Sequence, residues 1–247
     1  MSGHSKWSTI KHKKGAADAK RGRLFTKLIK EITMSAKVGG GIVESNPRLR
    51  SAVQAAKKAS MPADNIDKAI KRGTGELEGV TYEEVVYEGY GPGGAAILIE
   101  AMTDNKNRTT AEIRHLLTKY GGNMGTAGSV VFQFTKKGYI AVERSAASED
   151  ALMELALEAG AEDFRTEDSD VFEITTDPSS LESVRTVLEG KGIATQTAEV
   201  QMMPNTPVEV GDKGPALLKL LDMLEDHDDV QKVWSTGQVD DSYLQDA

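Results

Sequence analysis

Cysteine is absent from this chain of 247 residues. Its absence excludes disulfide bonds, thiolate nucleophiles and the zinc or iron–sulfur sites that use cysteine ligands. It is also typical of proteins in a reducing cytosol, so we expect a cytoplasmic location. No run of about 18 apolar residues occurs, and we therefore expect no membrane partner.

Aromatic residues are scarce as well, at 5% of the chain. Sheets that recognise RNA stack bases on exposed aromatic side chains and carry a characteristic aromatic string, which this sequence lacks. Signatures of catalysis are also missing: there is no nucleophile elbow, no Walker loop and no paired-histidine motif of the zinc proteases. We expect no enzyme activity, no cofactor and no small-molecule substrate.

Two short motifs resemble ligand sites but favour structural roles. The stretch GYGPGG at 89–94 has the glycine spacing of a dinucleotide-binding loop, but the run AAILIEA after it is typical of a strand rather than a helix. The stretch LEDHDD at 224–229 groups carboxylates with a histidine, yet it lacks the glycine of a calcium loop. His4 and His12 lack a second pair of ligands nearby. We expect a turn, a solvated acidic helix end and no metal.

Charge is divided unevenly along the chain. Residues 1–75 contain 17 Lys and Arg against 5 Asp and Glu, a net charge of +12, whereas the rest contains 13 against 33, a net charge of −20. A basic region attracts phosphate and an acidic one repels it, so this division indicates a polyanionic partner for the N-terminal part. The alternative is a basic domain that docks on the acidic remainder of the same chain.

The first 77 residues show a helical period. Apolar residues from 17 to 37 recur at spacings of three and four, and glycines 39–41 end the pattern. Asn46 and Pro47 are typical of the start of a second helix, and a third follows Ser60. Residues 1–77 are therefore predicted to form a basic three-helix domain.

Beyond this region the period changes to two. Strands are predicted at 82–87, 95–101 and 130–134, with a helix that starts at the capping box Thr109-x-x-Glu112. A final helix over 215–225 and a strand over 230–234 cannot form a core alone, so we expect them to complete this domain.

The intervening segment has the order strand, helix, strand, strand, helix, strand. The strands are expected at 139–143, 163–166, 171–175 and 195–202, with helices that begin at Ser148 and at Asp177-Pro178. This is the order of a ferredoxin-like domain. The sequence thus predicts a multi-domain α and α+β protein: a helical domain over 1–77, an α+β domain formed by 78–136 with 206–238, and a ferredoxin-like α+β domain over 137–205 inserted into it.

A possible anion contact lies at the predicted start of the middle helix. Lys106 and Arg108 stand where free backbone N–H groups and the positive end of the helix dipole would face an anion. The alternative is purely structural, because Asn107 and Thr109 are ordinary capping residues and Asp104 can close a turn.

The strongest candidate for binding is the basic stretch at the N-terminus. Lysine and arginine there outnumber acidic residues heavily, and Trp7 adds one ring that can stack. Such a segment binds nucleic acid through the phosphate backbone, with a steep dependence on salt; the alternative is a solvated helix face. The predicted nucleic-acid-binding residues are Lys6, Trp7, Lys11, Lys13, Lys14, Lys20, Arg21, Arg23 and Lys27.

Several strings along the chain resemble the YebC/PmpR family, in the same order. They are GHSKW, IKHKKGAADAKRGRLFTKLIKEI, NPRLRSAV, YEGYGPGG, TDNKNRTTAEIRH, KYGGNMGTAGSV, ALEAGAED and LDMLEDHDDVQKV. The resemblance covers nearly the whole chain and implies a helical first domain followed by two α+β domains, one interrupting the other. It also implies nucleic-acid contact at the basic positions of the N-terminal domain.

The resemblance implies two alternative functions. Members of the family are widely described as DNA-binding transcriptional regulators, which makes DNA the expected partner. Other members resemble translation factors that act on ribosomes through ribosomal or transfer RNA and relieve stalling, for example at proline stretches. The absence of an evident helix-turn-helix favours recognition of shape and phosphate, as on a ribosome. A protein-interaction scaffold is a third possibility, in which the basic domain would be incidental.

Overall fold

The computed structural model describes residues 18–168 and 170–244. Its first part is a bundle of three helices, α2 (Asp18–Gly39), α3 (Pro47–Lys58) and α4 (Ala63–Thr74). Their apolar faces meet in one hydrophobic cluster that includes Ile32, Leu49, Val53 and Ile66. Asn46 caps α3 as predicted, because its side chain accepts a hydrogen bond from the backbone N–H of Leu49.

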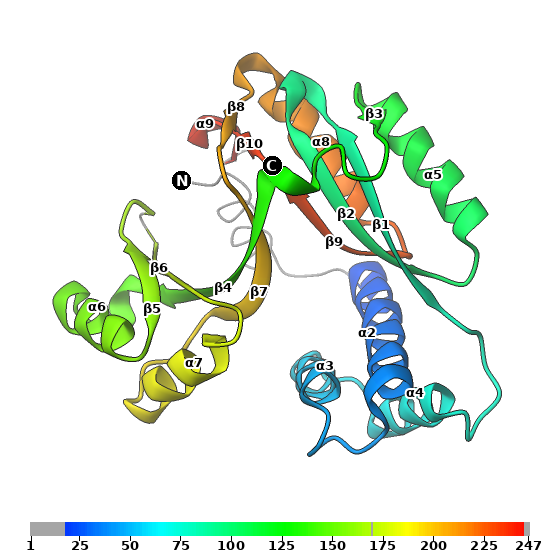
Figure 1. Cartoon of the computed structure of the whole chain (residues 1–247), viewed down its shortest axis with the longest axis horizontal. Coiled ribbons are helices and arrows are strands. Elements are labelled where there is room, and N and C mark those ends of the chain that lie inside the picture. Colours follow the sequence, from blue (N-terminus) through cyan, green and yellow to red (C-terminus); the bar gives the residue numbers. More distant parts are fainter. Residues whose placement is uncertain (1–17, 169, 245–247) are drawn as a thin grey trace.

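The middle part is an antiparallel sheet with the strand order β3-β1-β2-β9. The strands are β1 (Glu83–Tyr90), β2 (Ala96–Thr103), β3 (Asn123–Met124) and β9 (Val230–Ser235). Helices α5 (Lys106–Lys119) and α8 (Gly214–Glu225) pack on one face through a cluster that includes Ile99, Ile113 and Leu221 (Figure 1). A helix and a strand from the end of the chain therefore complete this domain, as predicted.

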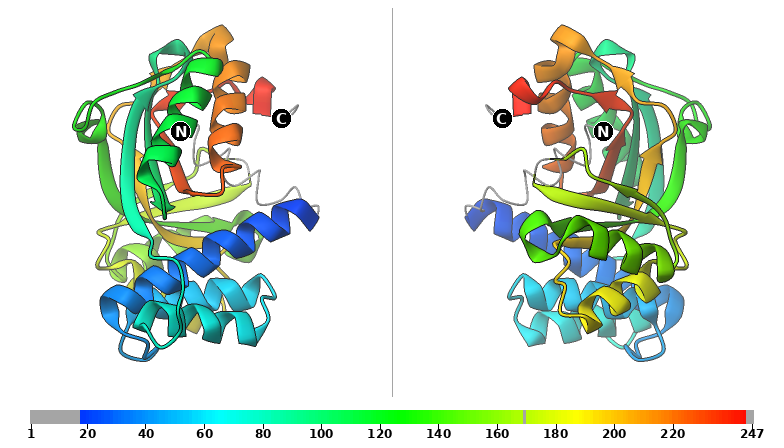
Figure 2. Two further views of the ribbon diagram at one scale, coloured as in Figure 1. Left: turned by 90° about the vertical axis from the view of Figure 1, so that its right-hand side faces the viewer. Right: turned by 90° about the vertical axis from the view of Figure 1, so that its left-hand side faces the viewer.

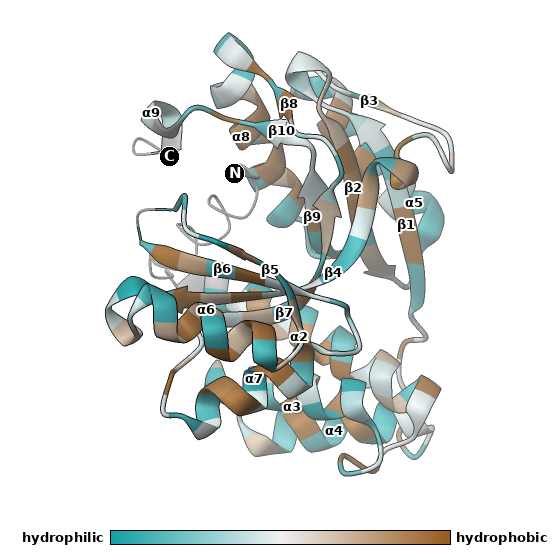
Figure 3. Cartoon of the chain, turned by 60° about the vertical axis from the view of Figure 1, so that its left-hand side comes forward, coloured by the Kyte–Doolittle hydropathy of each residue, from teal (hydrophilic) through white to brown (hydrophobic). Residues whose placement is uncertain are grey.

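The third part is a four-stranded sheet with the order β5-β6-β4-β7, antiparallel throughout. Its elements are β4 (Phe134–Glu143), α6 (Glu149–Glu158), β5 (Ala161–Arg165), β6 (Val171–Thr176), α7 (Leu181–Gly190) and β7 (Thr197–Pro204). Helices α6 and α7 pack on one face of the sheet (Figure 3). This order of strands and helices is the predicted ferredoxin-like arrangement.

The two α+β parts share a two-stranded connection. Strand β4 leads out of the middle part and β7 leads back, and the two pair from Phe134 with Pro204 to Ala141 with Thr197. The expected division at 136/137 therefore falls inside β4. The ranges 1–77, 78–136 with 206–238, and 137–205 remain a proposal, which the separate hydrophobic clusters of the three parts support.

Several predicted element boundaries were wrong, among them the start of β4, which is Phe134 and not Tyr139. Helix α5 begins at Lys106 and not at Thr109, because Asn105 is the residue that caps it, by accepting from the N–H of Arg108. The expected strand over 130–134 is a 3-10 turn at Val131–Gln133, after which β4 begins. Helix α7 begins at Leu181 rather than at Asp177-Pro178, since Asp177 accepts bonds from Ser179 in a preceding turn.

Smaller elements complete the chain. Strands β8 (Val208–Glu209) and β10 (Gly237–Gln238) pair in parallel, and a short helix α9 (Asp241–Leu244) follows. None of the helices in the described ranges is long and apolar enough to cross a membrane. Helix α2 lies between the α3–α4 pair and the helices α5 and α8 of the middle part (Figure 2), and this position brings its basic residues to the end of α8.

Candidate functional site

Of the predicted nucleic-acid-binding residues, only those from Lys20 onward lie in the part of the chain that the structure describes. Lys6, Trp7, Lys11, Lys13 and Lys14 lie outside the described residues, and Lys20 lies in the first turn of α2. The other three follow on α2. Arg21 is exposed, with its guanidinium carbon 5.6 Å from the ring centroid of Phe25. Arg23 and Lys27 point instead toward the middle part of the protein.

Arg23 and Lys27 contact the C-terminal end of α8. The Nη1 atom of Arg23 lies 3.0 Å from Oδ2 of Asp226, and Nζ of Lys27 donates to the backbone carbonyl of Glu225 at 2.5 Å. The last carbonyl groups of a helix carry partial negative charge and lack partners within the helix, so cations stabilise them. We call residues 225–229, which α2 contacts here, the acidic segment.

One turn further along α2, Lys30 makes a buried ion pair with the last residue of the acidic segment. Its Nζ atom lies 2.5 Å from Oδ1 of Asp229 and also donates to the backbone carbonyls of Asp228 at 3.0 Å and Met102 at 3.3 Å. The side chains of Lys30 and Asp229 are only 7% and 6% exposed. This contact joins the helical domain to the sheet of the middle domain.

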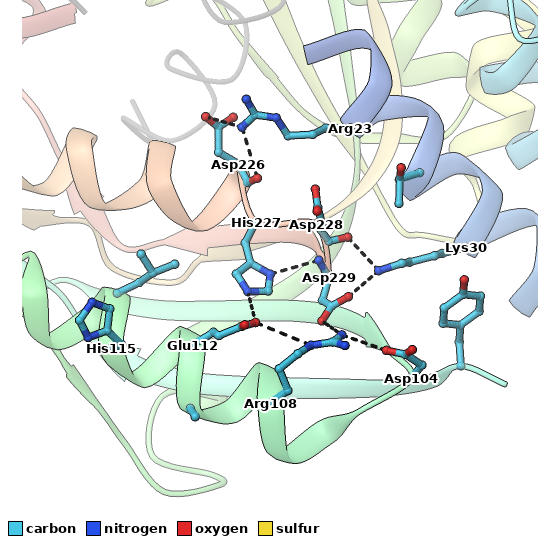
Figure 4. Close-up of a pocket in the computed structure, with 14 residues that line it drawn as sticks. Arg23, Lys30, Asp104, Arg108, Glu112, His115, Asp226, His227, Asp228 and Asp229 are labelled. Carbon is cyan, nitrogen blue, oxygen red and sulfur yellow. Dashed lines mark hydrogen bonds and ion pairs between the residues drawn. The ribbon is translucent and has the colours of Figure 1, made fainter. Parts of the chain in front are cut away.

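The other carboxylate oxygen of Asp229 is held by α5. Oδ2 accepts from Thr109 Oγ1 at 2.6 Å and from Arg108 Nη2 at 2.7 Å. Burial by itself would raise the pKa of Asp229, but the hydrogen bonds from Lys30, Thr109 and Arg108 outweigh it and hold the pKa well below its usual range. Asp229 is therefore an ionised carboxylate that ties α2, α5 and β9 together (Figure 4).

The two candidate anion-contact residues on α5 differ in their surroundings. Arg108 binds an anion supplied by the chain itself: its Nη2 atom lies 2.9 Å from Asp104 Oδ1 in addition to Asp229. Hydrogen bonds to these two carboxylates raise the pKa of Arg108 above its ordinary value. Lys106 is exposed in the first turn of α5, and its contact with an external anion stays a prediction.

Glu112, His227 and Asp229 lie close enough together to be considered as metal ligands. However, Nδ1 of His227 accepts the backbone N–H of Asp229 at 3.1 Å, so the neutral ring carries its proton on Nε2, which faces Glu112 Oε2 at 3.0 Å. Both ring nitrogens are thus engaged, and Asp229 is already saturated by donors. The geometry fits a hydrogen-bonded network better than a metal site.

These residues line an open cleft of about 1010 Å³ between α2, α5 and the acidic segment (Figure 4). Cationic and anionic side chains alternate around it, and Arg23, Lys30 and Arg108 are each paired with a carboxylate. The lining also holds carboxylates in excess of its cations, so every cation in it is neutralised by the chain's own acidic groups. The ion pairs of Arg23 and Lys30 connect α2 of the helical part to the acidic segment of the middle part.

Sequence reasoning missed the roles of Lys30, Thr109 and Asp229 in this contact. One signal was available: Asp228 and Asp229 stand directly before the apolar strand β9. A carboxylate that is buried at the start of a strand needs a cationic or hydrogen-bonding partner. The sequence could not name that partner, because Lys30 is 199 residues away along the chain.

A second basic surface, also missed, lies on the solvent face of α3. The helix sequence PRLRSAVQAAKK contains four cations and no carboxylate. Arg50, Gln54, Lys57 and Lys58 are exposed there, whereas Arg48 is paired with Glu31 and Glu84. This face therefore exposes three cations without a carboxylate partner on the helix, of which Arg50 donates to the backbone carbonyls of Val43 and Glu44.

Comparisons with known proteins cover nearly the whole chain. Residues 5–76 match the TACO1/YebC protein N-terminal domain, and residues 82–236 match the TACO1/YebC second and third domain. A "Probable transcriptional regulatory protein" of Desulfosudis oleivorans is 60% identical over 243 residues, which is 98% of each chain. One of the same name from Persephonella marina is 55% identical over 247 residues, 99% of each chain.

A solved structure agrees with the fold. The crystal structure of a conserved hypothetical protein, Aq1575 from Aquifex aeolicus, is similar with a TM-score of 0.82 and 46% sequence identity, over 91% of this chain and 93% of that one. The matches extend through the helical part and both α+β parts. The chain belongs to the TACO1/YebC family, whose curated relatives here are named as regulatory proteins.

Proposed function

We propose that this protein is a nucleic-acid-binding regulator of gene expression whose helical N-terminal domain contacts the phosphate backbone. The observation that carries the proposal is the division of charge, +12 in residues 1–75 against −20 in the remainder. A basic domain attached to acidic ones binds a polyanion with one end while the other end is repelled from it. The domain is thereby oriented toward nucleic acid.

Two groups of cations in the N-terminal part of the chain are available for this contact. One is the basic N-terminal stretch up to Arg21, and the other is the exposed face of α3 with Arg50, Lys57 and Lys58. Contacts of this kind position a protein on the backbone without reading sequence. The relatives named as probable transcriptional regulatory proteins favour DNA as the physiological partner.

One feature favours a second candidate function, the binding of structured RNA on the ribosome. In a helix-turn-helix the second helix enters the major groove by its N-terminal residues. In the α3–α4 pair, the second helix carries the exposed carboxylates of Asp64 and Asp67 near its N-terminus, and phosphate would repel them. This arrangement suits recognition of shape and phosphate more than the reading of base edges.

Binding to labelled duplex DNA and to labelled structured RNA tests the proposal. The wild type is compared, by fluorescence anisotropy at physiological salt, with a variant in which Lys11, Lys13, Lys14 and Arg21 are replaced by glutamine. We expect the variant to bind about 10- to 1,000-fold more weakly, since each lost phosphate contact weakens binding steeply at this salt concentration.

A matched control removes the same number of charges elsewhere. Replacement of four exposed lysines outside the helical domain by glutamine is expected to leave the affinity within a few-fold of the wild type; they are Lys136, Lys191, Lys213 and Lys219. Equal losses in both variants would reduce the effect to net charge and contradict the proposal. Co-sedimentation with ribosomes in excess duplex DNA separates the two functions: retention indicates the ribosome, and loss indicates DNA.

A further inference from the structure

Two of the cations predicted to bind phosphate are already bound by the protein itself. Arg23 contacts the carboxylate of Asp226, and Lys27 contacts the carbonyl of Glu225. Both partners belong to the acidic segment 225–229. Carboxylate and phosphate oxygens both accept hydrogen bonds from guanidinium groups, so Asp226 occupies Arg23 as a phosphate group would, while a helix-end carbonyl occupies Lys27.

The contacts between α2 and the acidic segment differ in exposure along the helix. Lys30 and Asp229 form the inner pair, with side chains 7% and 6% exposed. Arg23 and Asp226 form the outer pair, with side chains 37% and 35% exposed. A buried pair resists separation strongly, whereas a solvent-accessible pair contributes little and exchanges partners easily. The inner pair can therefore persist while the outer contacts open.

In the sequence, α2 directly follows the basic N-terminal stretch. Arg21 is exposed two residues before Arg23, and Lys20 stands in the same first turn of the helix. A phosphate backbone bound by the N-terminal stretch would therefore be brought to the part of α2 where the contacts with the acidic segment are most accessible. The two anions would then compete for Arg23 and Lys27.

We propose that nucleic-acid phosphates and the acidic segment are alternative partners of Arg23 and Lys27, so that this face of α2 is a phosphate-binding surface closed by the protein's own Asp226 carboxylate and Glu225 carbonyl. The proposal rests on the proposed function, and adds to it a contact surface and a competitor. Binding opens the outer contact, while Lys30 and Asp229 keep the two domains together. Nucleic acid affinity is thereby lowered by the fraction of molecules in which the contact is closed.

Asp226→Asn tests the competition, with Asp228→Asn as its control. Both substitutions remove one negative charge from the acidic segment. Asp226 pairs with Arg23 through its side chain, whereas Asp228 accepts from Lys30 through its backbone carbonyl, which the substitution leaves in place. We expect D226N to bind labelled structured RNA or duplex DNA up to about fivefold more tightly than D228N, the range given by one solvent-accessible ion pair.

Hydrogen–deuterium exchange provides a second readout on the wild type. The N–H of Asp226 is bonded to the carbonyl of Asp222, and that of Asp229 to the His227 ring. Addition of nucleic acid is expected to accelerate exchange in the peptide that covers 225–229 through its first residues, because α2 releases its outer contacts at Glu225 and Asp226 while the inner pair at Asp229 persists.

The outcomes separate this inference from the proposed function. Tighter binding by D226N than by D228N, with faster exchange in 225–229, supports the competition. Equal affinities of the two variants, or slower exchange on binding, overturn it while nucleic-acid binding itself stands. If the wild type and both variants bind neither nucleic acid, the proposed function fails and the competition fails with it.

Discussion

Replacement of Asp229 by asparagine is expected to destabilise the protein severely. The carboxylate accepts bonds from Lys30, Arg108 and Thr109, and its side chain is 6% exposed. Asparagine has the same shape, but an amide nitrogen replaces one acceptor oxygen. Its N–H groups would then face the donor groups of Lys30 or of Arg108 and Thr109. It also leaves the Lys30 ammonium buried without its counter-charge, which costs about 3–5 kcal/mol in comparable buried pairs.

Lys30→Met provides the internal comparison. Here the carboxylate of Asp229 keeps Arg108 and Thr109, and an apolar side chain of similar length replaces the ammonium group. We expect this variant to lose less, about 1–3 kcal/mol, because no charge is left without a partner. The order of the two variants follows from the geometry of the site and does not depend on the absolute values.

Urea unfolding at pH 7 measures both effects. The chain has two tryptophans, and Trp234 is buried on β9, five residues from Asp229. In a Trp7→Phe background its fluorescence reports on the middle domain. A loss below about 1 kcal/mol for D229N, or a larger loss for K30M than for D229N, would refute the reasoning.

The pH dependence of the same variant has a defined sign. The folded protein holds the pKa of Asp229 below its usual range, so its contribution is complete above the unfolded pKa of about 3.9 and disappears as the pH falls through the lower folded pKa. The difference in unfolding free energy between wild type and D229N should therefore stay constant between about pH 5 and pH 7. It should shrink below about pH 4.

Three further substitutions have defined outcomes in urea unfolding. Burial raises the pKa of Glu173 despite its bond from Tyr139, so Glu173→Gln should stabilise the protein by about 1 kcal/mol at pH 7, with no gain near pH 4. Gly73→Ala would place a Cβ atom in steric overlap with the Thr33 carbonyl oxygen where α4 crosses α2. It should lower the unfolding free energy by about 1–3 kcal/mol. Burial opposes ionisation of Glu88, but backbone N–H groups of the 128–131 loop outweigh it and lower its pKa; Glu88→Gln should cost about 1–3 kcal/mol at pH 7 and less in acid. No loss in the glycine or Glu88 variant, or a loss in the Glu173 variant, would contradict these assignments.

Much of the fold could be predicted because local signals agreed with the tertiary structure. The apolar periodicity and the Asn46-Pro47 start defined the helical domain, and the order of strands and helices identified the ferredoxin-like domain. The start of α7 was misplaced because Asp177 closes a local turn with Ser179, and the start of α5 because Asn105, not Thr109, is its cap. Thr109 has the sequence of a helix cap, but its hydroxyl is committed to Asp229, 120 residues further on.

The candidate site was less accessible to sequence reasoning. The basic stretch identified a polyanion as partner, but the sequence could not reveal that Arg23 and Lys27 face the end of α8, about 200 residues away. The alternative expectation, that the basic domain docks on the acidic remainder of the chain, agrees with the contacts that Arg23 and Lys27 make. The exposed face of α3 was overlooked because its cations are fewer than those of the N-terminal stretch and are interrupted by the apolar positions between Arg50 and Lys57.

The salt dependence of nucleic-acid binding tests the central claim most directly. For duplex DNA, the logarithm of the association constant falls with the logarithm of the salt concentration by about 0.9 per phosphate contact. If the N-terminal domain binds the phosphate backbone of the nucleic acid, replacement of Lys11, Lys13, Lys14 and Arg21 should reduce the magnitude of this slope by about 3 to 4. The four-lysine control should leave the slope unchanged. An unchanged slope in the N-terminal variant would contradict the account.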